Sequence, residues 1–131
     1  KNIANVKLIN ANATCLPFCD NTFDYLTISF GFRNIKHKTR ALKEMKRVLK
    51  PNGKLVHLDF GKSNWLVDLV FNFVLKIFYR KSAPYKYLLK SKDGFYSPSE
   101  LIEFFETKGF CLEKRVDYLF GIISLQIYKK N

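Results

Sequence analysis

One apolar stretch, Asn21–Arg33, constrains the fold more than any other part of the sequence. After Asp24 it carries no charge until its last residue, and aromatic and aliphatic side chains dominate it. Such a run is typical of a strand that helices cover on both faces. The strand is expected to stop at Gly31, and open α/β sheets bind ligands just beyond the carboxyl ends of their strands. The sequence therefore predicts a functional loop that contains Ser29, Gly31, Arg33 and Asn34.

The residues that follow predict a strand–helix–strand unit. Residues 35–49 place apolar side chains at helical spacing, with lysine and arginine on the opposite side, so we expect an amphipathic helix resting on a sheet. Pro51-Asn52-Gly53 is expected to end this helix, because proline cannot continue it and glycine accepts a positive φ. Residues 54–60 then read as another apolar strand. A helix that joins two strands of one sheet implies that the strands are parallel.

Further elements are predicted towards both ends of the chain. A short strand is expected over Val6–Ala11, with a polar turn at its carboxyl end. Ser97 is expected to start a helix as its N-cap, because Glu100 three residues later completes a capping box. Two apolar runs, residues 110–119 and 121–128, predict an antiparallel hairpin.

The most apolar segment, Trp65–Tyr79, predicts a helix that is too short to cross a membrane. At about 1.5 Å per residue it would span roughly 22 Å, short of the roughly 30 Å of a hydrocarbon core. Asp68, Asn72 and Lys76 recur every four residues and form one polar stripe. Two interpretations stay open: a helix packed within its own domain or a dimer, and a lid that contacts lipid or a lipid-like substrate.

Charge and cysteine content bear on the partners and the compartment. The net charge of +12 suits nucleic acid or an anionic membrane surface, although lysines scattered over helix faces and turns favour an ordinary solvated surface. The basic and aromatic loop Ser82–Tyr96 is only a weak indication of nucleic-acid binding. Cys15, Cys19 and Cys111 show neither a disulfide nor a zinc-site pattern, which favours a reducing compartment and no metal.

Three sequence segments together resemble one enzyme family. They are residues 12–24, residues 28–34 (Ile-Ser-Phe-Gly-Phe-Arg-Asn) and residues 41–53, which include Arg-Val-Leu-Lys-Pro-Asn-Gly. Leu-Pro-Phe and Leu-Lys-Pro-x-Gly occur in many S-adenosylmethionine-dependent methyltransferases, whereas Ile-Ser-Phe-Gly-x-Arg-Asn is more particular to the ubiquinone/menaquinone biosynthesis C-methyltransferases. The chain resembles that family specifically over about its first sixty residues and more loosely beyond them. The resemblance implies an α/β fold with the Rossmann-like sheet of class I methyltransferases, ending in an antiparallel hairpin.

The same resemblance assigns roles to five residues. It implies that Asn12 and Ala13 lie against the adenine of S-adenosyl-L-methionine and that Ser29 lies near its methionine end. Arg33 and Asn34 would face a quinol acceptor. A guanidinium beside a phenol oxygen favours the phenolate, whose ring carbon attacks the sulfonium methyl, and Asn34 or water could carry the proton away. No metal is required, and the alternative for Arg33 is a structural cation that closes the following helix.

Two departures from the family pattern change what is expected of the chain. Residues 58–63 read Leu-Asp-Phe-Gly-Lys-Ser where the family has Leu-Glu-Phe-Ser-Lys-Pro, which keeps an acid but alters the loop that follows. The Gly-rich turn and the ribose-binding acid of class I methyltransferases do not occur before Asn12. We therefore expect residues 1–131 to be the carboxyl-terminal part of a single methyltransferase domain without its first two strands, with 63–96 as a lid or substrate-side insertion. Alone, such a fragment is expected to bind S-adenosylmethionine poorly.

Three functions remain open at this point. The first is C-methylation of a polyprenyl benzoquinol or naphthoquinol by a cytoplasmic protein, with peripheral contact at the inner face of the membrane and oligomerisation as open alternatives. The second is a basic nucleic-acid-binding domain of methyltransferase type. It is disfavoured, and no nucleic-acid partner is expected, because Ser29–Phe32 stands where an Asn/Asp-Pro-Pro-Tyr motif would be needed. The third is a non-catalytic remnant that pairs with a separately encoded amino-terminal half.

Overall fold

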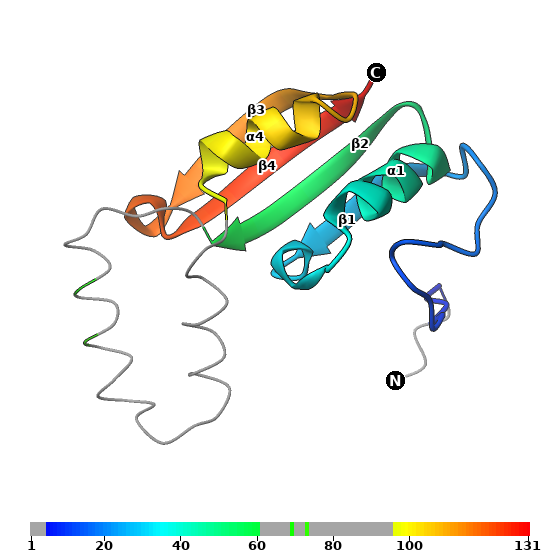
Figure 1. Ribbon diagram of the computed structural model, residues 1–131, viewed down its shortest axis with the longest axis horizontal. Helices are drawn as coiled ribbons and strands as arrows, with labels where there is room; N and C mark the ends of the chain where they lie inside the picture. Colours follow the sequence, from blue (N-terminus) through cyan, green and yellow to red (C-terminus); the bar gives the residue numbers. More distant parts are fainter. Residues whose placement is uncertain (1–4, 61–68, 70–72, 74–95) are drawn as a thin grey trace.

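The protein folds into a sheet with helices on one of its faces (Figure 1). The computed structural model describes residues 5–60, 69, 73 and 96–131. In chain order the elements are β1 (Phe23–Ser29), the 3-10 helix η1 (Phe32–Asn34), α1 (Lys38–Val48), β2 (Leu49–Phe60), α4 (Pro98–Glu106), β3 (Phe110–Tyr118), the 3-10 helix η2 (Leu119–Gly121) and β4 (Ile123–Lys130).

The sheet has the strand order β1-β2-β4-β3. β1 and β2 are parallel, as their connection through α1 predicts, and Ser29 pairs with Leu58 near their carboxyl ends. β4 lies antiparallel between β2 and β3. The parallel pair and the closing antiparallel hairpin confirm the predicted α/β fold class.

α1 and α4 lie on the same face of the sheet and form the hydrophobic core with it (Figure 1). Phe105 of α4 stacks on Tyr128 of β4, with ring centroids 4.6 Å apart. The Phe105 ring also lies 5.0 Å from the ring of Phe32, which belongs to η1 and is fully buried. This aromatic contact ties the segment that follows β1 to α4, so the loop predicted to be functional is fixed by the core.

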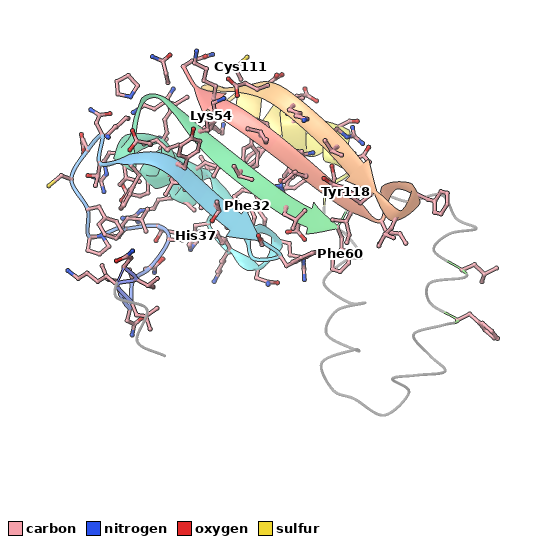
Figure 2. The ribbon with its side chains drawn as sticks, turned by 180° about the vertical axis from the view of Figure 1, so that it is seen from behind. Phe32, His37, Lys54, Phe60, Cys111 and Tyr118 are labelled. Atoms are coloured by element: carbon pink, nitrogen blue, oxygen red, sulfur yellow. The ribbon has the colours of Figure 1, made fainter. Side chains whose placement is uncertain are left out.

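The opposite face of the sheet is left uncovered by the described residues (Figure 2). Tyr25 of β1 is 64% exposed on this face, and its neighbours there include the half-buried side chains of Val56, Leu58 and Ile127. The prediction that helices cover both faces of the central strand is therefore wrong for the described part of the chain. A second buried face needs a second layer of helices, and these residues supply only one layer.

α4 begins as the sequence predicts. Ser97 Oγ accepts a hydrogen bond from the Glu100 backbone N–H at 3.3 Å, and Glu100 Oε2 accepts one from the Ser97 N–H at 2.6 Å. This capping box satisfies two backbone groups at the helix start. It also sets the helical register that turns Leu101 and Phe105 into the core.

Residues 6–11 do not form the predicted strand. The side chains of Val6, Leu8 and Ile9 are exposed, and no described strand pairs with this segment. The backbone groups of a strand need a neighbouring strand as partner, so favourable residue types alone do not produce one. The polar turn that follows is present, because an isolated bridge joins Asn12 and Cys15.

Pro51-Asn52-Gly53 does not end the helix as predicted. α1 already ends at Val48, because Leu49 pairs with Phe23 of β1, and the three residues form an irregularity within β2. Asn52, and not Gly53, adopts a positive φ of 63°. Gly53 is required for space instead, because a Cβ atom there would lie 2.9 Å from the Lys50 carbonyl oxygen and 3.2 Å from that of Asp24. This close approach holds the first part of β2 against the first part of β1.

The predicted lid, residues 63–96, lies outside the described residues except at three positions. Leu69 and Phe73 are helical with exposed side chains, and Tyr96 stacks against Phe104 of α4. Across the described ranges, no helix combines the length and the apolar character needed to span a bilayer. The assignment of this segment as a lid stays a prediction.

Candidate functional site

The candidate site lies where β1 and β2 end side by side. The backbone N–H of Phe30 donates to the Leu58 carbonyl at 2.8 Å, and Phe30 then takes a positive φ of 52° that turns the chain out of the sheet. The rim, as we name it, comprises residues 29–34 after β1 and residues 58–60 of β2. Open α/β sheets bind ligands at this kind of edge, just beyond the carboxyl ends of parallel strands.

Arg33 is fixed at the rim by a buried ion pair. Its Nη1 donates to Asp59 Oδ1, and the two side chains are 5% and 1% exposed. The guanidinium carbon lies 5.0 Å from the centre of the Phe60 ring and 5.9 Å from that of Phe30. One carboxylate and two rings therefore hold the guanidinium in place, and an arginine beside a ring face gains from the ring quadrupole as well.

Sequence reasoning missed the partner of Arg33. Asp59 stands out in the sequence only as an acid retained in a variant motif, and the alternative role considered for Arg33 placed it against the following helix. The ion pair instead ties Arg33 to β2, 26 residues further along the chain. A usable signal does exist, because parallel strands joined by a helix end at the same edge of a sheet. That rule places the residues after Ser29 next to those after Leu58.

A buried polar cluster lies beside Asp59 on the helix-covered face. His57 and Asp59 pair across the sheet with Gln126 and Ser124 of β4, and none of the four residues is more than 3% exposed. His57 Nε2 lies 3.8 Å from Asp59 Oδ2. Among the described residues, both His57 ring nitrogens, Asp59 Oδ2 and Ser124 Oγ have no hydrogen-bond partner. Burial lowers the pKa of His57, with the attraction of Asp59 acting in the opposite direction, so the imidazole is neutral at pH 7.

Asn34 and Ser29 are exposed at the rim. Asn34 Nδ2 donates to the Phe30 carbonyl at 3.5 Å, which holds the amide near the turn. Ser29 is the last residue of β1 and lies on the uncovered face of the sheet. The fold thus brings Ser29, Arg33 and Asn34 to one edge, and the roles assigned to them stay predictions.

Asn12 and Ala13 lie in a separate turn that precedes β1. Asn12 Oδ1 accepts hydrogen bonds from the Thr14 N–H and from the Thr14 hydroxyl, both at 2.9 Å. Ala13 is half-buried and packs against the hydrophobic core. Within the described residues, no hydrogen bond or ion pair joins this turn to the rim. Its place in a cofactor site therefore depends on the sequence resemblance.

Arg47 of α1 anchors the loop that contains this turn. Its guanidinium donates to the carbonyl groups of Leu16 and Phe18 and pairs with Asp20 and Glu44. Glu44 Oε2 in turn accepts a hydrogen bond from the Leu16 N–H at 2.8 Å. These hydrogen bonds, that from Arg47 above all, lower the pKa of Glu44 to about 2. A charged network, rather than a strand, thus holds this loop against α1.

Both the sequence and the fold match known methyltransferases. The sequence matches the model of the ubiE/COQ5 methyltransferase family over residues 1–130. It is 37% identical over 140 residues to a demethylmenaquinone methyltransferase of Geobacillus sp. (strain WCH70). This match covers 100% of this chain and 60% of that protein. A demethylmenaquinone methyltransferase of Staphylococcus aureus (strain JH9) is 38% identical over 137 residues, covering 97% of this chain and 57% of that protein.

Among solved structures, a SAM-dependent methyltransferase from Aquifex aeolicus superposes with a TM-score of 0.66 and 23% identity. The match covers 95% of this chain and 54% of that chain. At this identity the likeness supports the fold alone. The chain spans about 60% of the length of the curated relatives it matches.

Proposed function

This chain belongs to the ubiE/COQ5 methyltransferase family, and from that premise we propose that it forms part of an enzyme that methylates a ring carbon of a polyprenyl quinol. The methyl donor would be S-adenosylmethionine, whose sulfonium supplies an electrophilic methyl group. The names of the curated relatives favour demethylmenaquinol, a naphthoquinol, as the acceptor. A benzoquinol of ubiquinone biosynthesis is the alternative within the same family.

The observation that carries this proposal is the fixed guanidinium of Arg33 at the rim. A cation beside a phenol oxygen lowers the pKa of that phenol and stabilises the phenolate. The phenolate directs electron density to the ring carbon, which would form a bond to the methyl carbon as the bond from that methyl to the donor sulfur breaks, leaving S-adenosylhomocysteine. That carbon would then lose its proton to water and the aromatic phenol would be restored. The amide of Asn34, at the exposed side of the rim, can hydrogen-bond the water that takes up the proton. Asp59 contributes by holding the guanidinium in one position.

The residues present fit one part of a methyl-donor site. Ser29 offers an exposed hydroxyl at the end of β1. Asn12 uses its Oδ1 within its own turn, which leaves its amide N–H groups for an adenine. The small side chain of Ala13 packs on the core, and the resemblance to the family places the adenine ring beside it. Because the sequence has no Gly-rich turn and no acid for the ribose hydroxyls, we assign only part of the cofactor contacts to these residues.

The test uses a chimera that joins this chain to the part of the Geobacillus relative that lies outside the match. Transfer of labelled methyl from S-adenosylmethionine to demethylmenaquinol is expected of the chimera. Arg33→Lys keeps the positive charge but removes the planar guanidinium, whose several N–H donors fix the position of that charge. The kcat of this variant should therefore fall by about 100-fold or more. Arg115→Lys changes an exposed, ion-paired arginine of β3 and should leave kcat within about twofold.

Two results would contradict the proposal. One is a folded chimera that binds S-adenosylmethionine but transfers no methyl group to either quinol class. The other is an Arg33→Lys chimera with the kcat of the unchanged one. The urea midpoint of each variant, measured alongside, separates loss of activity from loss of folding.

Peripheral membrane contact is a further part of this proposal, because a polyprenyl acceptor resides in a bilayer. Leu119 and Phe120 of η2 are 60% and 89% exposed. Their turn lies beside the rim, since Ile123, two residues beyond it, pairs with Phe60. Co-sedimentation with phosphatidylcholine vesicles tests this contact: it should weaken in Phe120→Ser and stay unchanged in Tyr25→Ser, which removes an exposed ring elsewhere.

A further inference from the structure

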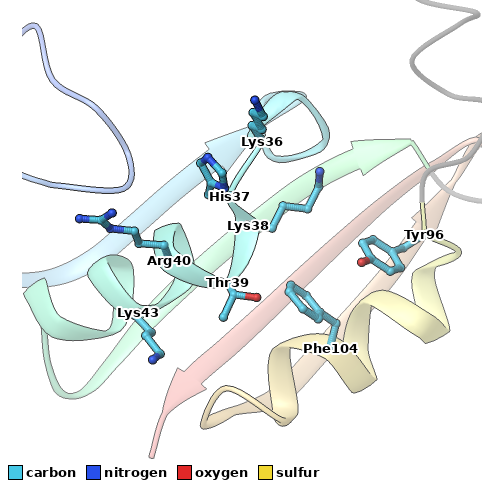
Figure 3. Close-up of a pocket in the computed structure, with 8 residues that line it drawn as sticks. All are labelled: Lys36, His37, Lys38, Thr39, Arg40, Lys43, Tyr96 and Phe104. Carbon is cyan, nitrogen blue, oxygen red and sulfur yellow. The ribbon is translucent and has the colours of Figure 1, made fainter.

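A hollow of about 810 Å³ lies between α1 and α4 (Figure 3). Residues 36–40 and Lys43 line its α1 side, and Tyr96 and Phe104 line its α4 side. We name this hollow the groove. Of its described lining residues, every one that carries a charge is basic, namely Lys36, Lys38, Arg40 and Lys43. A concave surface of one charge sign concentrates the potential and attracts ligands of the opposite sign.

The groove cations form none of the close ion pairs that cations elsewhere in the described fold form, although Arg40 lies near enough to Glu44 to help lower the pKa of that carboxyl. None of the four forms an ion pair within the described residues, and Lys38 Nζ donates to the neutral carbonyl of Ile35 at 2.9 Å. By contrast, carboxylates pair with Arg33, Arg47, Lys50, Lys54 and Arg115. The groove therefore gathers mutually repelling charges whose free energy an anion would lower.

The start of α1 adds to this positive field. His37, the N-cap residue, makes no side-chain hydrogen bond to the helix, and the first turn contains no acidic residue. The first backbone N–H groups of an eleven-residue helix thus carry their partial positive charge towards the same region as Lys36 and Arg40. In Figure 3, Lys38 and Thr39 lie on the side of this helix start that faces the aromatic rings, whereas Arg40 extends away from those rings.

The opposite wall of the groove is aromatic. The rings of Tyr96 and Phe104 stack with centroids 5.5 Å apart and planes inclined by 11°. Tyr96 is 41% exposed, so this wall presents apolar surface to a ligand. A groove with one cationic wall and one aromatic wall suits an organic anion better than a bare inorganic ion.

We propose that the groove binds the phosphate group of an organic phosphate, whose apolar or planar portion packs on the aromatic wall. Phosphate is favoured over carboxylate because it offers more oxygen acceptors and a larger charge to several cations at once. The same chemistry is available from a soluble organic phosphate and from the headgroup of an anionic lipid. The site is independent of the methyl transfer proposed above, since it uses none of the rim residues.

The soluble source is tested by calorimetric titration of the chain with phenyl phosphate. The groove variant Lys36→Gln/Arg40→Gln/Lys43→Gln should weaken binding by about tenfold or more. The matched control, Lys7→Gln/Lys114→Gln/Lys129→Gln, removes the same number of cations from outside the groove and should weaken it by less than about twofold.

A single substitution guards against a folding artefact. Thr39→Glu places a carboxylate in the groove, where it should repel phosphate, and in the first turn of α1, where a negative charge stabilises a helix. Loss of phenyl phosphate binding without loss of stability in this variant can only come from the groove.

The lipid source is tested by co-sedimentation with phosphatidylcholine vesicles that contain phosphatidylglycerol, against vesicles of phosphatidylcholine alone. Binding that requires phosphatidylglycerol and is lost in the groove variant, without measurable phenyl phosphate binding, supports the proposal with a headgroup as ligand. Saturable phenyl phosphate binding lost in the groove variant supports it with a soluble ligand. Equal losses in the groove and control variants, or no binding in either assay, would overturn it.

Discussion

Arg33 and the groove cations follow one another in the sequence, yet the fold treats them differently. Arg33 is buried and paired with Asp59, whereas Lys36 and Lys43 line an open groove without an anionic partner in the described residues. The difference comes from what lies opposite each group. β2 presents a carboxylate to η1, while Phe104 of α4 and Tyr96, which precedes α4, present aromatic rings to the groove. Charge alone therefore does not distinguish a cation that a buried carboxylate holds in place from one that lines an open groove.

The free energy of unfolding should respond differently to substitutions in the two regions. A buried ion pair contributes little by itself, but removing one partner leaves the other charged and desolvated. An exposed lysine has no such dependence, because water solvates it whether or not an anion is present. Substitutions at the rim should therefore change the free energy of unfolding more than substitutions in the groove.

The largest effect is expected from Asp59→Asn. It keeps the shape of the side chain but leaves the buried guanidinium of Arg33 without its counter-charge, so the free energy of unfolding should fall by about 3–5 kcal/mol. The matched control is Asp24→Asn, which removes the partner of Lys50 at an exposed site and should cost less than about 1 kcal/mol. Urea unfolding followed by circular dichroism measures both. Similar losses of unfolding free energy in the two variants would contradict the expectation that the ion pair at the rim matters more to stability than an exposed pair.

The elements that the sequence predicts correctly are those determined by local chemistry. The capping box at Ser97 and Glu100 needs only side chains three residues apart, and the helix over 38–48 needs only the spacing of its own apolar residues. The segment 6–11 has suitable residue types but forms no strand, because a strand also needs a neighbour that local sequence does not reveal. The exposure of Tyr25 has the same origin, since burial depends on a second layer.

The candidate site, too, could be predicted from the sequence only where it depends on local pattern. The edge at which Ser29, Arg33 and Asn34 lie follows from the strand–helix–strand pattern, because that pattern fixes where β1 ends. The contact of Arg33 with Asp59 depends on the register of β1 against β2, and the polar cluster around His57 depends on β4, which is far along the chain. Spacing within one segment carries no information on either register.

An intermediate effect is expected from pH, because the buried cluster beside the rim contains a histidine. His57 lies beside Asp59 in the buried cluster, and its pKa is lowered by burial against the opposing attraction of Asp59. Below about pH 6.5 the unfolded chain takes up a proton at His57 that the folded chain does not. Stability should therefore increase as the pH rises towards 6.5, by at most about 1.4 kcal/mol per pH unit from this group, and the contribution should level off above it.

The check is the free energy of unfolding between pH 5 and pH 7, measured for the unchanged chain and for His57→Gln. His57→Gln should flatten the slope, because glutamine takes up no proton in this range. A slope unchanged by His57→Gln, or one that falls with rising pH, would mean that the buried cluster does not exclude charge as its burial requires.

The smallest effect is expected from the groove itself. Lys36→Gln and Lys43→Gln remove cations with no anionic partner in the described residues, so each should change the free energy of unfolding by no more than about 0.5 kcal/mol. Thr39→Glu should be neutral or stabilising, by about 0.3–1 kcal/mol, through the start of α1. Urea unfolding at low and high salt measures these changes, and screening should shrink them further. A loss above about 1 kcal/mol on removing either lysine would show that the groove cations support the fold as the Arg33–Asp59 pair does, and the two regions would then differ only in exposure.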